Sequence, residues 1–286
     1  MKLTTTRKDH TSNGLITYAK GMDKSLGEKE KLLPYVKEGV ILEIGCGAGA
    51  VTELLAKNFP RSTIIGIDNS EQIITVAAKR EYSNANVHLF QGDVLNKQFK
   101  NGTVDTVVMS SVFHEIYSYN NYDMEAISKA IFNVCAMLVP GGRLLIRDGV
   151  MPGLKPCYLK FIKPELRKVF EKFAKDFAPR KIHYSLEDNF EFPKLNSADA
   201  YEFLSKYFYT ENWKIEVKEQ FGIFTVAEYC NLLMVNQLKI VEANSYLIEF
   251  LKNKYEKEIW LLEKKGEEFV RIDYPASTAI IVGEKI

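Results

Sequence analysis

Short apolar runs alternate with amphipathic stretches over residues 40–150. Such an alternation is typical of buried strands joined by helices, and it predicts a parallel sheet covered by helices on both faces. The expected strands are Val40–Ile44, Ser62–Ile67, Val87–Gln91, Val104–Ser110 and Arg143–Asp148. The expected helices between them are Val51–Asn58, Glu71–Arg80 and Asp123–Leu138. Pro140, Gly141 and Gly142 then separate the last helix from the strand that follows it.

The alternation stops after Asp148 and resumes near Thr225. Residues from about 152 to 215 are charged and rich in aromatic side chains, so we interpret 152–215 as a helical insertion. The segment TVAE at Thr225 is a capping-box signal for a helix that runs to about Asn236. The elements expected after it are a strand Lys239–Tyr246, a helix Ile248–Lys265 and a strand Thr278–Glu284. The expected organisation is N-terminal helices over 1–39, a core formed by 40–151 and 216–286, and the insertion.

Composition places this chain among globular proteins. Its 286 residues, 46% of them hydrophobic and 26% charged, suffice for one large core or for a core with an insertion. The sequence contains no apolar run of about 18 residues and begins with a polar segment, so we expect neither a membrane span nor a signal peptide. The expected location is the cytoplasm, with no membrane partner.

Cysteine spacing and net charge narrow the chemistry further. The cysteines at 46, 135, 157 and 230 form no CxxC pair, so neither a zinc site nor a dense disulfide framework is expected, and we predict no metal. A formal net charge of +1 argues against a domain dedicated to coating nucleic acid.

A glycine-rich loop follows the first expected strand. Gly45, Gly47 and Gly49 stand between a strand and a helix, where the missing Cβ atoms let the backbone turn sharply and approach a ligand closely. This spacing also satisfies the dinucleotide fingerprint, with Asp68 downstream to bind a ribose. The glycines alone therefore predict a cofactor loop without naming the cofactor.

Neighbouring residues give the loop a specific resemblance. LEIGCGAG, in which Glu43 precedes the first glycine by two positions, is similar to the first motif of class I S-adenosylmethionine-dependent methyltransferases. The segments VDTVVMSSVFHEI and LVPGGRLLIRD resemble this family's fourth strand with its loop and its entry into the fifth strand. The resemblance implies a Rossmann-like, doubly wound, seven-stranded and mostly parallel sheet, with the insertion as a helical lid. It also implies S-adenosylmethionine as the cofactor.

Acidic residues after the second and third strands fit the same cofactor. Asp68 ends IIGID at the carboxyl edge of the sheet, where its carboxylate can accept both ribose hydroxyls; a helix N-cap is the alternative, which Asn69 or Ser70 could supply instead. Asp93 in FQGDVLN resembles the family's adenine-binding acid, with a turn after Gly92 as the alternative. The predicted cofactor-binding set is Tyr18, Glu43, Gly45, Cys46, Gly47, Gly49, Asp68, Asn69, Gly92, Asp93, Val94, Ser110 and Ser111.

Polar side chains after the fourth strand supply the candidates for catalysis. Methyl transfer requires alignment of the acceptor and, for some acceptors, removal of its proton. Histidine is the side chain best suited to exchange a proton near neutral pH, so His114 is the leading candidate base, with packing beside the cofactor as the alternative. Asp148 could position an amine or a hydroxyl, or act as a turn former before Gly149. Tyr117 is a candidate substrate-binding residue.

The insertion is strongly basic. Between Lys155 and Lys181 the sequence holds nine basic residues against three acids, followed by many aromatic residues. Most of these lysines fit the solvent face of an amphipathic helix whose apolar stripe is Leu159, Ile162, Leu166, Val169, Phe170 and Phe173. Arg167, Arg180 and Lys181 are the candidates for recognising a carboxylate or phosphate of the substrate.

Four functions remain open on these grounds. The first is methyl transfer to an oxygen or nitrogen atom of a small molecule or modified peptide of secondary metabolism, with a carboxylate acceptor explaining the basic lid. The absence of a [DN]PP[YFW] run and of a Pro-Cys nucleophile lowers the rank of nucleobase methylation. The alternatives are an RNA or tRNA methyltransferase that tracks phosphates, a non-catalytic binding module and a nicotinamide oxidoreductase.

Overall fold

The computed structural model describes residues 26–186 and 192–286, which form two compact units. The first unit contains the described residues up to Asp148 together with Glu228–Asn244 and Ile280–Ile286. The second contains Gly149–Ala227 and Ser245–Ala279. The chain thus leaves the first unit after Asp148, returns for one helix and one strand, and leaves it once more before its last strand.

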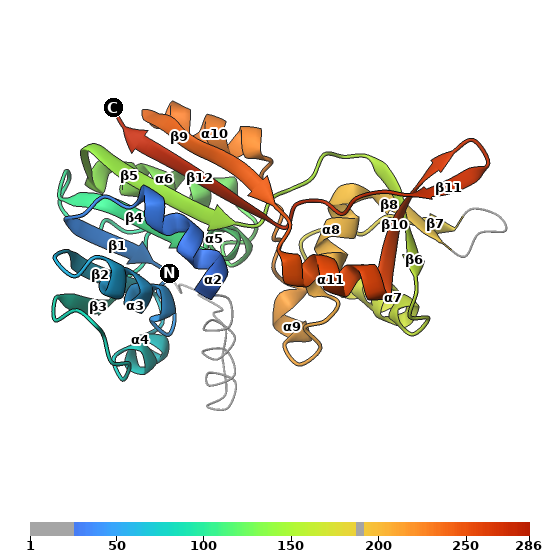
Figure 1. Ribbon diagram of the computed structural model, residues 1–286, viewed down its shortest axis with the longest axis horizontal. Helices are drawn as coiled ribbons and strands as arrows, with labels where there is room; N and C mark the ends of the chain where they lie inside the picture. Colours follow the sequence, from blue (N-terminus) through green and yellow to red (C-terminus); the bar gives the residue numbers. More distant parts are fainter. Residues whose placement is uncertain (1–25, 187–191) are drawn as a thin grey trace. The chain divides into compact units, whose positions relative to one another are not determined.

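A mixed, mostly parallel seven-stranded sheet forms the centre of the first unit, in the order β3-β2-β1-β4-β5-β12-β9 (Figure 1). The pairs β1–β2, β2–β3, β1–β4 and β4–β5 are parallel. This order and direction confirm the expected α/β fold. The strands are β1 (Val40–Ile44), β2 (Thr63–Asp68), β3 (Val87–Gln91), β4 (Val104–Ser110), β5 (Leu138–Asp148), β9 (Leu238–Tyr246) and β12 (Thr278–Lys285).

Helices of the first unit begin where the sequence offers caps. Ser70 accepts a hydrogen bond from the backbone of Ile73 and begins α4, and Asp123 accepts one from Glu125 and begins α6. One face of α6 is buried. The helices are α2 (Leu26–Lys29), the 3₁₀ helix η1 (Glu30–Tyr35), α3 (Ala50–Asn58), α4 (Glu71–Ala77), α5 (Phe113–Ser118), α6 (Met124–Met137) and α10 (Val226–Val235).

The second unit has a sheet of its own, in the order β11-β10-β6-β8-β7. Its neighbouring strands are antiparallel. Helices α7 and α8 contribute Phe170, Phe173 and Phe203, whose rings contact one another in the core of this unit. Its elements are β6 (Pro156–Phe161), α7 (Leu166–Asp176), β7 (Ser185–Leu186), β8 (Pro193–Asn196), α8 (Ser197–Lys206), α9 (Trp213–Glu216), α11 (Glu249–Glu258), β10 (Ile259–Lys265) and β11 (Glu268–Arg271).

Three expected elements differ from the structure. The strand expected over Arg143–Asp148 begins at Leu138, so β5 includes the residues Pro140, Gly141 and Gly142 that were expected to precede it. The helix expected over Ile248–Lys265 ends at Glu258, because the apolar run that begins at Ile259 pairs with β6 as strand β10. Leu159 and Ile162 do not belong to the amphipathic helix that the spacing predicted: Leu159 lies in β6, and α7 begins at Leu166. Apolar and polar residues alternate only weakly in short strands that carry prolines and lysines. The sequence therefore predicted a helical insertion over 152–215 without a sheet.

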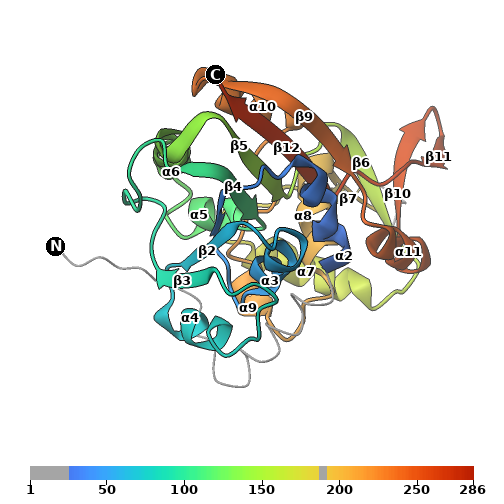
Figure 2. The same cartoon turned by 60° about the vertical axis from the view of Figure 1, so that its left-hand side comes forward.

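Figure 2 shows β9 and β12 as neighbouring strands near the C-terminus. By contacts, residues 245–279 between them belong to the second unit, whereas the sequence pattern had placed 216–286 entirely in the core. Within the described ranges, no helix combines the length and the apolar character needed to cross a membrane.

Candidate functional site

Parallel strands of the first unit present their carboxyl ends at one edge of the sheet. Ile44 of β1 is level with Ile67 of β2 and with Met109 of β4, and Met109 is level with Ile146 of β5. The glycine loop, Asp68, Ser110 and Asp148 follow these positions by one or two residues. The sheet therefore brings the expected cofactor residues and the expected catalytic residues to the same edge, as in other open α/β sheets that bind ligands there.

Left-handed backbone conformations shape the glycine loop. Gly45, Gly47 and Gly49 have φ angles of 70°, 54° and 80°, which residues with a side chain rarely adopt. A Cβ atom on Gly45 would lie 2.5 Å from Cγ2 of Val112, which follows β4. The amides of Gly45 and Cys46 donate to the carbonyl of Ile67, at 2.8 and 2.9 Å. The loop therefore fits tightly against the ends of β2 and β4, and glycine is required there.

Asp68 binds this loop through its carboxylate. Its Oδ2 accepts a hydrogen bond from the amide of Gly47 at 3.1 Å, and its Oδ1 accepts one from the amide of Ser70 at 2.9 Å. Ser70, one of the two residues expected to supply the helix cap, provides the N-cap of α4. Because a carboxylate oxygen can accept two hydrogen bonds, holding the loop and binding ribose hydroxyls are compatible roles for Asp68.

Glu43 is a buried residue of β1, two positions before the first glycine of the loop. The side chain of Thr52 on α3 donates a hydrogen bond to its carboxylate at 2.5 Å. Burial raises the pKa of Glu43 to about 8, against the opposing effects of the Thr52 hydrogen bond and the positive charge of Lys29. A carboxyl group with this pKa is largely protonated at neutral pH and gains from a cationic group brought next to it.

Residues around the expected adenine site form turns. Leu95 donates its amide to the Asp93 carboxylate at 2.9 Å, and the backbone carbonyl of Asp93 accepts from Asn96. The amide of Gly92 donates to the carbonyl of Asp68, so the second and third strand ends are joined. The turn that was the alternative role for Asp93 is present. The adenine contact of Asp93 and the cofactor contacts of Asn69, Gly92 and Val94 remain predictions.

His114 and Asp148 form a buried pair at the ends of β4 and β5. Nδ1 of His114 and Oδ1 of Asp148 are 2.6 Å apart, and the two side chains are 10% and 1% exposed. The other carboxylate oxygen of Asp148 accepts the amides of Phe113 and His114 at 2.6 and 3.3 Å, at the beginning of α5. Asp148 therefore fixes both the first turn of α5 and the orientation of the imidazole.

Ser110 and Ser111 lie where β4 ends. The Oγ of Ser110 is buried, and Ser111 has a φ of 57°, which is uncommon for a residue with a side chain. The Oγ of Ser111 accepts a hydrogen bond from the guanidinium of Arg147 at 3.3 Å. Arg147 was not among the predicted site residues. An arginine inside the apolar run LLIRD, where a buried strand was expected, is the sequence feature that could have indicated it.

The remaining predicted substrate residues lie in different surroundings. Tyr117 belongs to α5, and its ring contacts the ring of Tyr122. Arg167 pairs with Glu171 along α7. Arg180 donates through Nε and Nη2 to Asp199, at 3.0 and 2.6 Å. Lys181 is exposed. Tyr18 lies outside the described residues, as does most of the N-terminal segment expected to cap the cofactor.

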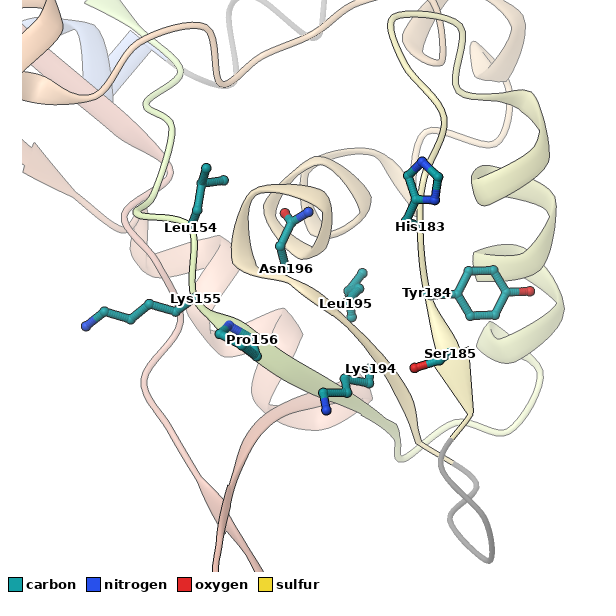
Figure 3. Close-up of a pocket in the computed structure, with 9 residues that line it drawn as sticks. All are labelled: Leu154, Lys155, Pro156, His183, Tyr184, Ser185, Lys194, Leu195 and Asn196. Atoms are coloured by element: carbon teal, nitrogen blue, oxygen red, sulfur yellow. The ribbon is translucent and has the colours of Figure 1, made fainter.

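A hollow of about 470 Å³ lies within the second unit. Figure 3 shows His183 and Tyr184 before β7 and Lys194 and Leu195 on β8 around it. Its cationic lining residues are Lys155 and Lys194. These lysines, rather than Arg180, are the basic groups that border a hollow of this unit.

Comparison with known proteins agrees with the geometry of the first unit. Residues 41–142 match a family model described as a methyltransferase domain. A malonyl-[acyl-carrier protein] O-methyltransferase of Halalkalibacterium halodurans is 40% identical over 76 residues, 26% of this chain and 28% of that protein. A protein of the same name from Priestia megaterium is 30% identical over 129 residues, 43% of this chain and 42% of that protein.

A third relative is a demethylmenaquinone methyltransferase of Staphylococcus aureus, 26% identical over 159 residues, 53% of this chain and 61% of that protein. The matched segments thus span between about a quarter and three fifths of the length of these curated relatives.

Solved structures share the fold. An S-adenosylmethionine-dependent methyltransferase of Mesorhizobium loti has a TM-score of 0.56 at 12% identity. The match covers 92% of this chain and 100% of that one. Human N-acetylserotonin methyltransferase in complex with its cofactor has a TM-score of 0.51 at 12% identity, covering 96% of this chain and 56% of that one. The glycine loop, the acids at the strand ends and the matched domain agree: residues 41–142 are similar to a methyltransferase domain, and the chain shares its fold with S-adenosylmethionine-dependent methyltransferases.

Proposed function

We propose that this protein transfers a methyl group from S-adenosylmethionine to an oxygen or nitrogen atom of a small molecule or a modified peptide of secondary metabolism. The observation that carries the proposal is the His114–Asp148 pair, 2.6 Å apart and buried at the edge of the sheet that also presents the glycine loop. A base at this edge suits an acceptor that must lose a proton as it is methylated.

The residues of the first unit fit the cofactor of the family. The glycine loop makes a turn that residues with a side chain rarely adopt, Asp68 offers a carboxylate for the ribose hydroxyls, and Glu43 offers one for the cationic methionyl portion. When bound, S-adenosylmethionine would supply a methyl group on a sulfonium, whose carbon the acceptor attacks in line as the sulfur leaves as a thioether. The protein's own task is to align the acceptor and to exclude water.

In this proposal, Asp148 determines which imidazole nitrogen takes the proton. Its carboxylate accepts a hydrogen bond from Nδ1–H of His114, so the basic lone pair of the neutral ring lies on Nε2. The acceptor's proton moves to Nε2, and the negative charge of Asp148 stabilises the imidazolium that results. The protonation of the ring is inferred from this contact.

A carboxylate is the acceptor that the relatives favour within this class. Two relatives are named as O-methyltransferases of malonyl-[acyl-carrier protein]. The basic stretch between Lys155 and Lys181 suits an anionic substrate, and Lys155 and Lys194 border the hollow of the second unit. Since a carboxylate is already deprotonated at pH 7, His114 would then position it and would not act as a base.

Labelling of natural substrates tests this proposal. The protein is incubated with methyl-labelled S-adenosylmethionine and a fractionated extract of its source organism, and the labelled product is identified by mass spectrometry. A labelled small molecule or peptide is expected, with the label on oxygen or nitrogen. Labelled RNA would contradict the proposal and favour the alternative in which the basic segment tracks phosphates.

Calorimetry separates the remaining alternatives. Titration with S-adenosylhomocysteine and, separately, with NAD should show binding of the first compound alone. Absence of binding to either would favour a non-catalytic module, and binding of NAD alone would favour an oxidoreductase. A control protein with Gly45→Val should lose binding, because its side chain would enter the space occupied by Val112.

A further inference from the structure

Arg147 is a buried cation without an acidic partner in the described ranges. Its side chain lies on β5, and the residue is 5% exposed. Nη1 donates to the Ser111 Oγ at 3.3 Å, whereas the buried Nε has no hydrogen-bond partner among the residues that the structure describes. No carboxylate within that part of the chain lies within 4.0 Å of this guanidinium. Buried guanidinium groups are ordinarily paired, since removing such a charge from water is costly.

Arg143 shows that the same strand pairs an arginine where the role is structural. Arg143 lies four residues earlier on β5 and therefore on the same face. Its Nε donates to Glu284 at 3.0 Å, and its Nη1 donates to the carbonyl of Tyr35 at 3.1 Å. The missing acid at Arg147 is thus a property of that position and not of the strand.

A second unpartnered group lies beside Arg147. Ser110 of β4 is directly opposite Arg147 in the register, so both side chains project from the same face of the sheet. The Ser110 Oγ is buried and has no partner among the described residues. Ser111, with a φ of 57°, places its Oγ against the guanidinium. Two hydroxyls and a guanidinium therefore converge here, and the group that would accept from them is not part of the described chain.

We propose that Arg147 and Ser110 bind a carboxylate of a ligand, with Ser111 holding the guanidinium in position. A carboxylate matches the planar fork of arginine through paired, charge-assisted hydrogen bonds and also accepts from a hydroxyl. It would supply the negative charge that this buried site lacks. The inference rests on the proposed function, because the ligands it considers are those of methyl transfer.

Two ligands of the reaction offer this chemistry. One is the methionyl carboxylate of the donor, and the other is a carboxylate of the acceptor. Met109 is level with Ile44, so the next residue, Ser110, is level with Gly45. Arg147 pairs with Ser110 and therefore lies at the same level as Gly45, two strands away. That separation is about 10 Å between backbones, which an arginine side chain can bridge toward a ligand in the loop or beside it. Both sources are compatible with this position, and binding measurements distinguish them.

Matched ligands with and without a carboxylate test the proposal. Wild type, Arg147→Met and the control Arg143→Gln are titrated with S-adenosylhomocysteine and with 5′-methylthioadenosine, which lacks the amino-acid portion. If the donor carboxylate is bound, Arg147→Met should raise the ratio of the two dissociation constants at least tenfold, while the control leaves it unchanged. Using a ratio cancels any general weakening of the site in the variant.

Malonate and neutral malonamide test the acceptor source in protein saturated with S-adenosylhomocysteine, whose own carboxylate fills the donor position. If the acceptor carboxylate is bound, malonate should stabilise wild type and Arg143→Gln more than malonamide does, and Arg147→Met should lose that difference. A variant that shifts neither the cofactor ratio nor the malonate difference overturns the inference. The proposed function fails separately, when wild type itself does not bind S-adenosylhomocysteine.

Thermal stability without ligand gives an independent readout. Because a buried, unpaired charge is replaced by an apolar side chain of similar length, Arg147→Met should keep or raise the Tm. An arginine with a structural role would instead lower it. A lowered Tm together with unchanged ligand ratios would identify Arg147 as a structural residue and overturn the proposal.

Discussion

The two units differ in whether their buried charged side chains have partners of opposite charge. In the second unit, Lys206 and Glu202 are 0% and 1% exposed and lie 2.6 Å apart. The Glu202 carboxylate also accepts the amides of Phe221 and Gly222, at 3.1 and 2.7 Å. In the first unit, the buried guanidinium of Arg147 has no acid beside it in the described ranges, and buried Glu43 has its pKa raised to about 8.

This contrast distinguishes buried charges that stabilise the fold from buried charges that belong to a ligand-binding site. Partners within the chain satisfy the charges of the second unit, as in the Arg180–Asp199 pair and in Glu258, which accepts from Lys163 and Tyr207. At the carboxyl edge of the first sheet, polar groups are left incomplete or protonated. Departures of this kind are expected at binding sites, where local stability is given up for function.

The largest expected effect concerns His114. For an acceptor that must lose a proton, His114→Ala should lower turnover by about 10²- to 10⁴-fold without weakening binding of S-adenosylhomocysteine, because a positioned base acts on the reaction and not on the cofactor. The measurement is kcat for the acceptor found by labelling, over a range of pH. The control is His88→Ala, since His88 is exposed on β3. Unchanged kcat in His114→Ala would make this histidine a packing or positioning residue.

The next effect concerns the second unit. Its absence would contradict the view that ion pairs within this unit stabilise the fold. Lys206→Met should lower the free energy of unfolding by about 3–5 kcal/mol, because the carboxylate of Glu202 stays buried with an uncompensated charge. Denaturation of the full chain by urea measures it. The double variant Lys206→Met/Glu202→Gln should regain most of the loss, whereas Lys172→Met, from an exposed pair with Asp176, should cost about 1 kcal/mol or less.

A smaller effect is expected at Asp68. Asp68→Ala should weaken binding of S-adenosylhomocysteine at least tenfold, or about 1.4 kcal/mol. Because Asp68 also holds the amides of Gly47 and Ser70, calorimetry should compare adenosine with 2′,3′-dideoxyadenosine. A ribose contact predicts that the variant loses more affinity for adenosine. Equal losses for both would assign Asp68 to the loop alone, and Asp123→Ala serves as a control for a helix cap.

The smallest effect is a fraction of a proton at Glu43. Its pKa of about 8 leaves the carboxyl group mostly protonated at pH 7, and the cationic methionyl portion of the cofactor should lower that pKa. Binding of S-adenosylmethionine should therefore release a proton, detected by calorimetry in buffers of different ionisation enthalpy. Glu43→Gln should abolish the release. Proton uptake in wild type would contradict the assignment.

The same raised pKa predicts how stability depends on pH without cofactor. Because the pKa of Glu43 is higher in the folded protein than its usual 4.5, its contribution to stability is complete below that pH and decreases as the pH rises toward 8. The free energy of unfolding of wild type should thus decline over this range more steeply than that of Glu43→Gln. Parallel curves for the two proteins would show that the pKa is not raised.

Much of the first unit could be predicted from the sequence because its elements are buried on one or both sides and separated by clear caps. The strands expected at Val40–Ile44, Val87–Gln91 and Val104–Ser110 have these bounds in the structure. The second unit was harder, since its strands are short and pair antiparallel across distant segments. The run after Glu258 carried an apolar pattern that fits a helix or a strand, and pairing with β6 decided between them.

The candidate site was predictable where motif order places residues at strand ends, as for Glu43, Asp68 and Asp148. Spacing cannot show which partner a side chain chooses. Arg180 was expected to recognise a substrate, and its guanidinium binds Asp199, which a sequence pattern does not reveal. Arg147 was missed for the opposite reason, because its significance lies in the acid that it lacks within the described residues.

The position of β12 affects how the protein is assembled during synthesis. This strand lies between β5 and β9 in the first sheet, although it is the last of the three along the chain. While a ribosome is still translating residues 245–279, β9 has no neighbouring strand to join. The first unit therefore completes its sheet after the second unit has been synthesised, and a nascent chain stalled before residue 278 should expose the edge of β5 to chaperones or to aggregation.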